Sequence, residues 1–273
     1  MIKQVFSHPF VKWLFTAIFL VGAVHLISAF TYDRTLQYKE VVFQSEKIAP
    51  SLDGYTIAFL TDIHAYPHSK LETVVENLNE RGISLVLLGG DFPGGAALSP
   101  CIDILAALNA PDGIYSVDGN HDNPRVLAEE LQRYTIPLLE NQGVQIREGL
   151  YLAGTEDLYY RSPDAQKAIT EAGEDDFVLM LCHNPDTSVA CDFTGVDLTL
   201  SGHTHGGEVT VFGLFGPAMP LVSRYGQRFR SAWAQSGAGT PVYVSNGIGN
   251  HFPIRVFAPP QVILLTLRAA TTE

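Results

Sequence analysis

Residues 55–91, YTIAFLTDIHAYPHSKLETVVENLNERGISLVLLGGD, decide the fold of this chain. Residues 55–60 form an apolar run that predicts a buried strand ending at Asp62. Residues 70–81 carry apolar side chains at helical spacing and stop at Gly82, and residues 83–88 form a second apolar run that ends at Asp91. The stretch therefore predicts a strand–helix–strand unit.

The same alternation continues along the chain. Residues 99–108 have a helical pattern, residues 113–117 form a strand that ends at Asn120, and Pro124 starts a helix that runs to residue 134. Three such units in a row imply a largely parallel sheet covered by helices. The second half is richer in strands and predicts a second sheet packed on the first, with residues 212–223 as a long loop near the site. The predicted strands there are residues 177–181, 196–200, 208–212, 241–244 and 262–267.

Polar motifs follow these predicted strands, where open α/β sheets bind their ligands. Their side chains are carboxylates, imidazoles and one amide, which borderline divalent metals prefer, and about seven or eight of them suffice for two ions that share a bridge. The motifs are Thr61-Asp62-Ile63-His64, Gly89-Gly90-Asp91, Gly119-Asn120-His121-Asp122, Cys182-His183-Asn184 and Gly202-His203-Thr204-His205.

Each motif offers a specific ligand. Asp62 and His64 are two residues apart, so both can reach one ion from a strand-like segment. Asp91 follows two glycines that let the backbone approach closely, and it can bridge two cations. Asn120 offers a neutral carbonyl oxygen. The remaining candidate ligands are the imidazoles of His183, His203 and His205.

Two ions roughly 3.5–4 Å apart would clamp a phosphate and supply a bridging hydroxide near neutral pH. His121 is then a spare imidazole, which we interpret as the general acid that protonates the leaving oxygen or as a stabiliser of the transition state. Asp122 either orients His121 or is simply solvated. One such motif alone is weak evidence, but five in order, each at a predicted strand end, favour a metal site over chance.

The pattern DxH, GD, GNH, H and GHxH over residues 55–205 resembles the calcineurin-like metallophosphoesterase superfamily. The resemblance implies a four-layered α/β/β/α sandwich with a dinuclear site for manganese, iron or zinc, among which the sequence does not choose. Carried over to this sequence, it assigns one ion to Asp62, His64, Asp91 and His205 and the other to Asp91, Asn120, His183 and His203, with His121 catalytic.

The tail of the chain narrows the resemblance. Residues 202–207, 246–249, 253–255 and 259–260 are similar to the membrane-anchored bacterial phosphodiesterase group, some members of which are UDP-2,3-diacylglucosamine pyrophosphatases of lipid A synthesis. Two positions depart from that group: Glu208 stands where glutamine is common, and Gln261 where an acidic residue is common. His251 and Arg255 are candidate contacts to a substrate phosphate, or else ordinary loop residues.

Residues 13–30, WLFTAIFLVGAVHLISAF, form an apolar run close to the length that crosses a bilayer. We favour an uncleaved single-pass anchor (residues 1–35) before a catalytic domain (residues 40–273), over a cleaved signal or a buried helix. This predicts a bacterial cytoplasmic (inner) membrane location. Lys3 and Lys12 precede the run while Arg34 and Lys39 follow it, a charge difference that leans toward an extracytoplasmic domain and is too small to decide.

Composition excludes some classes of function. The net charge of −12 argues against a nucleic-acid surface. Three cysteines are too few for a disulfide framework, and Cys182 points to the core if His183 points to a site.

The sequence predicts a membrane-tethered hydrolase of phosphodiester or pyrophosphate bonds, acting on a lipid-linked nucleotide such as UDP-2,3-diacylglucosamine. An extracytoplasmic phosphodiesterase acting on another cell-envelope or nucleotide substrate is the main alternative. A phosphoprotein phosphatase and a non-catalytic scaffold are less favoured, the latter because a scaffold would be expected to lose ligands. The sequence does not specify the oligomeric state.

Overall fold

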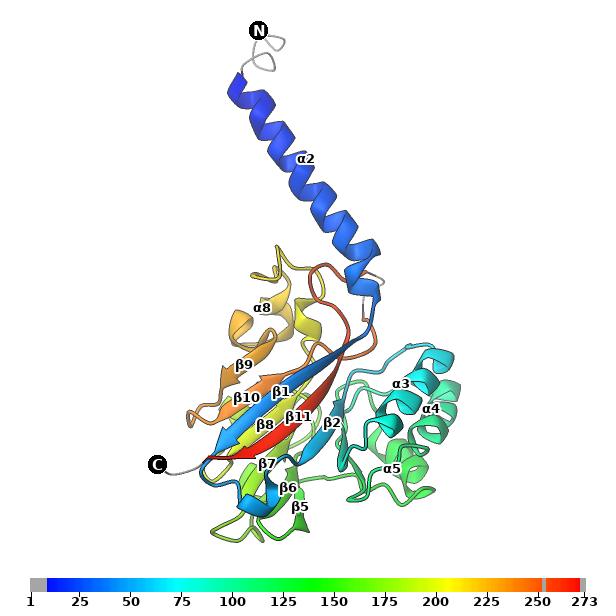
Figure 1. Cartoon of the computed structure of the whole chain (residues 1–273), viewed down its shortest axis with the longest axis vertical. Coiled ribbons are helices and arrows are strands. Elements are labelled where there is room, and N and C mark those ends of the chain that lie inside the picture. The colour runs from blue at the N-terminus through cyan, green and yellow to red at the C-terminus, as the bar shows by residue number, and fades with distance from the viewer. Residues whose placement is uncertain (1–8, 252–253, 271–273) are drawn as a thin grey trace.

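The computed structural model describes residues 9–251 and 254–270, so Lys3 and Pro253 lie outside the described residues (Figure 1). One sheet has five strands in the order β1-β11-β2-β3-β4. Strand β11 is antiparallel to β2, and the other neighbours in this sheet are parallel. Its strands are β1 Gln37–Ser45, β2 Thr56–Leu60, β3 Leu85–Leu88, β4 Ile114–Ser116 and β11 Gln261–Ala269.

The second sheet has six strands in the order β5-β6-β7-β8-β10-β9. Its four central strands are parallel, and an antiparallel strand closes each edge. Its strands are β5 Gln142–Arg147, β6 Leu150–Gly154, β7 Phe177–Leu181, β8 Leu198–Ser201, β9 Ala232–Gln235 and β10 Pro241–Val244. The predicted mixed α/β fold with a second sheet is therefore confirmed.

The core lies between the two sheets. Alternate residues of β2 point to opposite faces, so Ile57 and Phe59 pack toward the second sheet while Ala58 and Leu60 pack under the helices. Both faces of this strand are buried, which is why its sequence is apolar throughout. Three helices cover the outer face of the first sheet, and their apolar side chains form one hydrophobic cluster with it. They are α3 His68–Glu80, α4 Leu98–Leu105 and α5 Pro124–Gln132.

The outer face of the second sheet packs against a short helix. Cys182 is buried there, with Sγ 3.2 Å from Ser201 Oγ and pointing away from His183, as predicted. The remaining short elements are α6 Ala165–Ala168, α7 Thr187–Ala190, α8 Met219–Val222 and the 3-10 turns Tyr32–Arg34, Pro50–Leu52, Gly95–Ala97, His205–Gly207 and Gly226–Phe229.

The prediction of a strand at residues 208–212 is wrong. Glu208 and Phe212 have positive φ angles of 46° and 52°, which an extended strand does not allow. This segment forms only isolated bridges, from Val209 to Val256 and from Val211 to Phe215. The predicted long loop after it contains α8, beside the site.

Helix α2, Pro9–Phe30, projects from one end of the molecule (Figure 1). It is long and apolar enough to cross a membrane, and its place near the N-terminus equally suits a signal sequence. Its base is fixed to the domain by the buried carboxylate of Asp33. This group accepts hydrogen bonds from Ser28 Oγ (2.6 Å) and from the amides of Phe257 (2.7 Å) and Ala258 (2.9 Å).

Candidate active site

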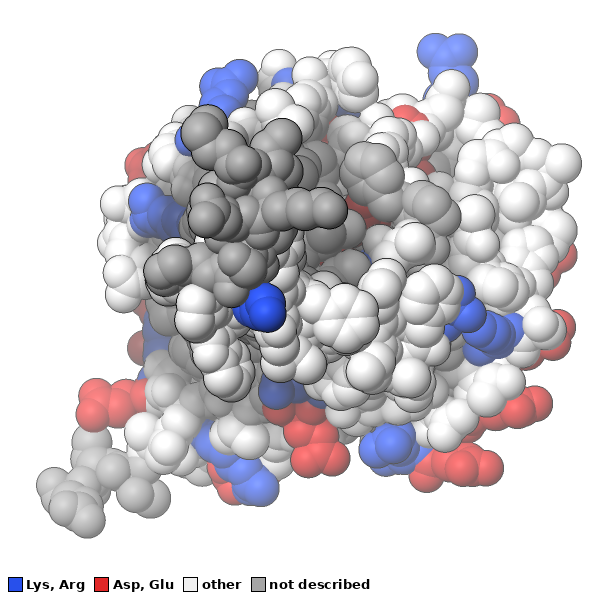
Figure 2. Space-filling model, turned by 90° about the horizontal axis from the view of Figure 1, so that it is seen from above, with Lys and Arg blue, Asp and Glu red and all other residues white. Residues whose placement is uncertain are grey.

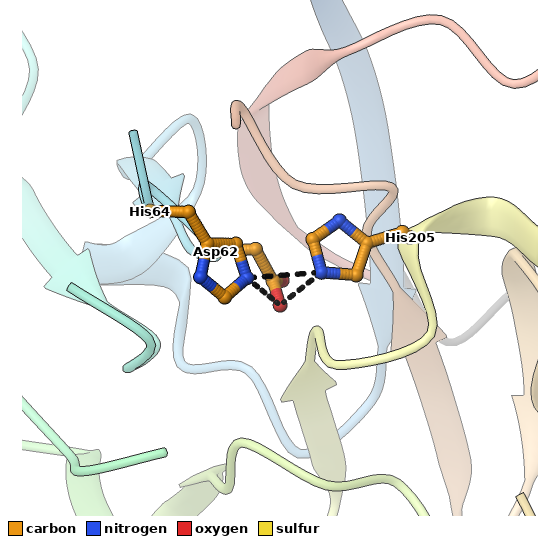
Figure 3. Close-up of side chains that lie close together, drawn as sticks. All are labelled: Asp62, His64 and His205. Carbon is orange, nitrogen blue, oxygen red and sulfur yellow. Dashed lines mark hydrogen bonds and ion pairs between the residues drawn. The ribbon is translucent and has the colours of Figure 1, made fainter. Parts of the chain in front are cut away.

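Two groups of metal-ligating side chains lie together at the carboxyl ends of strands from both sheets. The first group is Asp62, His64 and His205 (Figure 3), and the second is Asp91, His183 and His203. Within each group the ligand atoms lie within 4.8 Å of one another. Six of the seven predicted metal ligands are thus gathered into two clusters.

Asp91 belongs to the second cluster and also faces the first. Its Oδ2 is 3.5 Å from His64 Nε2 and 3.3 Å from His183 Nε2. The other oxygen, Oδ1, accepts a hydrogen bond from the amide of His121 at 2.8 Å. One carboxylate oxygen therefore faces both clusters, as a bridging ligand must.

The first cluster converges tightly (Figure 3). Asp62 Oδ1 is 3.3 Å from His205 Nε2, which is itself 3.1 Å from His64 Nε2. Burial lowers the pKa of His64 to about 4 and that of His205 well below its usual value, so both rings are neutral near pH 7. Neutral imidazole nitrogens directed at a carboxylate fit a divalent cation.

The second cluster contains acceptors that lack a protein donor. His183 Nδ1 donates to the carbonyl oxygen of Gly89 at 2.7 Å, which leaves Nε2 free to be a ligand. Among the described residues, neither His183 Nε2 nor the buried Oδ1 of Asn120 has a hydrogen-bond partner. Buried polar atoms without partners are rare, and here both fit a metal ion. The donor set therefore fits two divalent cations.

The charge around His183 supports the same fit. Burial lowers the pKa of this ring, but the carboxylates of Asp91 and Asp62 raise it more, and the net shift is well above the usual value. The site thus stabilises positive charge at the place where its ligands converge. His203 is different: burial lowers its pKa to about 3, and its Nε2 donates to the carbonyl oxygen of Val222 at 3.2 Å.

The backbone at the ligands is strained. Non-glycine residues rarely adopt positive φ, which costs about 1–3 kcal/mol each and concentrates at functional sites. Five of the seven candidate ligands have it: Asp62 (54°), His64 (43°), Asp91 (56°), His203 (69°) and His205 (51°).

Two glycines allow the loops after β3 and β4 to touch. A Cβ on Gly119 would collide with the carboxylate of Asp91, and a Cβ on Gly90 would lie 2.6 Å from the amide nitrogen of Gly119. Gly90 also has a φ of 86°. The close backbone approach predicted before Asp91 is confirmed.

Asp122 ties the same two loops together. Its carboxylate accepts hydrogen bonds from the amides of Asp91 (2.8 Å), Phe92 (2.9 Å) and Gly119 (2.8 Å). Burial and the charge of Asp91 raise its pKa to about 7. Its carboxylate is largely buried and bound to these amides, so neither sequence alternative, orienting His121 or being solvated, describes its position.

A cavity of about 470 Å³ opens beside the clusters. His121 is exposed on its wall, with its ring centroid 5.4 Å from that of His64 and 5.5 Å from that of His251. His251 lines the same cavity. Part of the wall is apolar, and no Lys or Arg occurs among the described residues that line it. The apolar and aromatic lining residues are Tyr159, Tyr160, Val209, Ala218, Leu221 and Val222.

Arg255 requires a correction. It is only 2% exposed and does not line this cavity, because its donors are engaged within the protein. It holds the chain around His205, and one guanidinium nitrogen lies 3.3 Å from His205 Nδ1. Its acceptors are the carbonyl oxygens of His205, Asn246, Gly249 and Ala258 and the side chain of Asn250.

Sequence reasoning missed several residues at the site. Tyr159 packs against His203 with ring centroids 5.4 Å apart, and no motif marks it. Glu208, noted only as a departure, lines the cavity and accepts a hydrogen bond from the amide of His251 at 2.7 Å. Its Oε1 is 3.8 Å from His205 Nδ1.

Comparison with known proteins agrees with this geometry. Residues 55–207 match the family model of the calcineurin-like phosphoesterases. The uncharacterized metallophosphoesterase YkuE of Bacillus subtilis is 27% identical over 98% of this chain and 99% of its own length. The phosphodiesterase YaeI of Escherichia coli is 28% identical over 83% of this chain and 86% of its own. An uncharacterized metallophosphoesterase of Campylobacter jejuni is 29% identical over 94% and 70%. This chain belongs to the calcineurin-like phosphoesterase family and is a metal-dependent phosphoester hydrolase.

Proposed function

We propose that the chain is a membrane-anchored hydrolase of phosphodiester or pyrophosphate bonds. The observation that carries the proposal is the pair of ligand clusters joined by Asp91, with His121 on the wall of the adjoining cavity. Residues 1–35 are the anchor and residues 40–273 the catalytic domain, at the bacterial cytoplasmic membrane.

The charge of the cavity supports a diester over a monoester. Each phosphate of a phosphodiester, or of a pyrophosphate esterified at both ends, carries one negative charge near pH 7, whereas a monoester phosphate carries nearly two. Among the described lining residues there is no cationic Lys or Arg to balance the second charge. When bound, two divalent ions would supply positive charge to the phosphate and acidify water.

The side chains then divide the work. Asp62, His64, Asp91 and His205 would hold one ion, and Asp91, Asn120, His183 and His203 would hold the other. His121 is exposed to the cavity beside the clusters and donates a proton to the leaving oxygen. His251 contacts the substrate phosphate or its leaving group.

The specific substrate that we propose is UDP-2,3-diacylglucosamine, which would place the enzyme in lipid A synthesis. The apolar part of the cavity wall suits an acyl-bearing substrate. An extracytoplasmic phosphodiesterase acting on another cell-envelope or nucleotide substrate uses the same site and is the main alternative. The Escherichia coli relative is named as a phosphodiesterase, which favours the diester class.

The test uses the full chain in detergent, supplied with manganese, iron or zinc. Bound metal per chain is measured together with hydrolysis of bis-p-nitrophenyl phosphate and p-nitrophenyl phosphate. We expect two ions per chain and faster hydrolysis of the diester. Asp91→Asn should abolish both metal binding and activity, and an active Asp91→Asn protein would overturn the assignment. Product analysis with UDP-2,3-diacylglucosamine tests the specific substrate, because failure there alone leaves the diesterase class intact.

A further inference from the structure

Large apolar side chains are exposed beside the active-site cavity. We call five of them the apolar rim. Leu221, which is one of the five, lines the cavity. Val209, which precedes the other four in the sequence, lines it too, so the rim adjoins the site. A soluble surface rarely exposes such a patch without a partner. The rim residues, with exposed fractions, are Val211 (45%), Phe212 (45%), Leu214 (81%), Phe215 (50%) and Leu221 (86%).

The rim also touches helix α2. The ring of Phe212 lies 4.6 Å from that of His25, centroid to centroid, and 5.6 Å from that of Phe257. The buried Asp33 fastens the chain after α2 to Phe257, so the helix base and the rim are held together. Residues 9–24 of α2 extend beyond this contact, which at 1.5 Å per residue is about 24 Å of apolar helix.

The end of the molecule that carries α2 has few charges at its centre. Figure 2 looks onto this end: among the atoms not drawn in grey, uncharged side chains cover most of the middle of the view, one basic side chain lies near its centre, and most other charged side chains lie toward the margin. In Figure 1, α8, which carries Leu221, lies at the same end of the domain as the base of α2. The exposed apolar surfaces of α2 and of the apolar rim therefore lie at the same end of the molecule, where one lipid phase can cover both.

We propose that the apolar rim docks into the surface of a lipid bilayer that holds α2, and that the cavity receives an amphiphilic phosphoester directly from that bilayer. The rim adjoins the cavity on its membrane-facing side and the metal clusters lie on the other, so the acyl chains stay in lipid while the phosphoester reaches His121. The substrate part of this inference rests on the proposed hydrolase activity, and the docking part rests on the proposed membrane anchor but not on that activity. The net charge of −12 favours zwitterionic over anionic lipid.

Docking is tested on the full chain in phosphatidylcholine nanodiscs. A fluorescent label is attached to Leu214→Cys in a Cys191→Ser background, since Cys101 and Cys182 are buried. The matched control is Val126→Cys, 44% exposed on α5 and far from α2 in Figure 1. Lipids carrying a nitroxide near the headgroup should quench the label at residue 214 at least twofold more than the label at residue 126. Equal quenching would overturn the inference, as would a label at residue 214 shielded only at high protein concentration, which would reveal a second copy.

Delivery from the bilayer is tested by kinetics. Hexadecyl p-nitrophenyl phosphate in phosphatidylcholine vesicles is compared with soluble bis-p-nitrophenyl phosphate. Leu214→Glu should slow hydrolysis of the vesicle-borne probe about tenfold and leave the soluble reaction unchanged, because it weakens only the seating on lipid. Val126→Glu should change neither. Equal rates of wild type and Leu214→Glu on vesicles would overturn delivery from the bilayer. If the wild type hydrolyses neither probe, the proposed function fails while the quenching result still decides docking.

Discussion

His121 differs from its neighbours in the motifs by being exposed to the cavity and belonging to neither metal cluster. Its amide donates to Asp91 Oδ1, so the backbone of the proton donor is fixed to the residue that faces both clusters. A short chain of contacts therefore sets the distance between the proposed acid and the metals. We therefore expect that proton donation by His121 and metal binding by the two clusters can be removed independently.

Replacing His121 with alanine should lower kcat by about 10²- to 10⁴-fold, the usual contribution of general acid catalysis. The metal content should stay at two ions per chain, because His121 is not in either cluster. Diester hydrolysis and elemental analysis of the same sample measure the two quantities. His251→Ala serves as the control and should raise KM more than it lowers kcat. Loss of metal from His121→Ala would contradict the assigned role.

Arg255 shows what the sequence did not reveal about single residues. The sequence left Arg255 either as a substrate contact or as an ordinary loop residue, but this side chain is buried and binds backbone carbonyl groups. Burial lowers its pKa to about 10, so it remains charged near pH 7. Its partner His205 lies 50 residues earlier, a separation at which no local pattern indicates contact.

Arg255→Lys should destabilise the fold by on the order of 2–3 kcal/mol, because a lysine cannot reproduce the forked guanidinium and leaves buried carbonyl groups unpaired. Urea unfolding of the full chain in detergent measures the free energy. The control is Arg268→Lys, whose ion pair with Asp53 is exposed, and its effect should be within about 0.5 kcal/mol. Similar small effects in both variants would show that Arg255 is not a structural centre.

Among the elements, the strand–helix units were predictable and the later loops were not. Strands β2 and β3 are buried on both faces, so their apolar runs are distinct, and α3 presents one apolar stripe. Strands β5 and β9 are mostly exposed or half-buried edges and lack such a signal. Residues 208–212 alternate like a strand, but the positive φ of Glu208, next to the ligand His205, prevents strand pairing. The requirements of the site override local propensity there.

The loops after β3 and β4 act as one unit because Asp122 accepts three of their amides. Asp122→Ala should cost at least about 2 kcal/mol, since three buried donors lose an ionisable acceptor. It should also speed amide exchange at Asp91 and Gly119 and weaken metal binding. The control in the same loop is Asn123→Ala, which removes only the N-cap of α5 and should cost about 1 kcal/mol with metal retained. Unchanged exchange at Asp91 would contradict the proposed link.

At the scale of the whole molecule, the two sheets meet at the metal site. Three predicted ligand segments follow β2, β3 and β4 of one sheet, and the others follow β7 and β8 of its partner. The apolar core joins the sheets along their length, whereas at the metal site the contacts are polar and include the carboxylates of Asp62 and Asp91. Burial, with a contribution from Asp91, raises the pKa of Asp62 to about 6, which reflects the cost of charge there.

Two cations would offset that charge and connect the sheets, so metal removal should destabilise the whole domain. A ligand at about 100 times its dissociation constant stabilises the folded state by about 2.7 kcal/mol per site, so two ions contribute about 5.4 kcal/mol, which for a domain of this size is about 11–22 °C in Tm. Chelation should lower Tm by this amount, and added manganese or zinc should restore it. In Asp91→Asn, which we expect to bind little metal, chelation should leave Tm unchanged. Exchange should increase in the loops after both β3 and β8, because one ion set holds both. An unchanged Tm after verified metal removal would show that the core alone holds the sheets together.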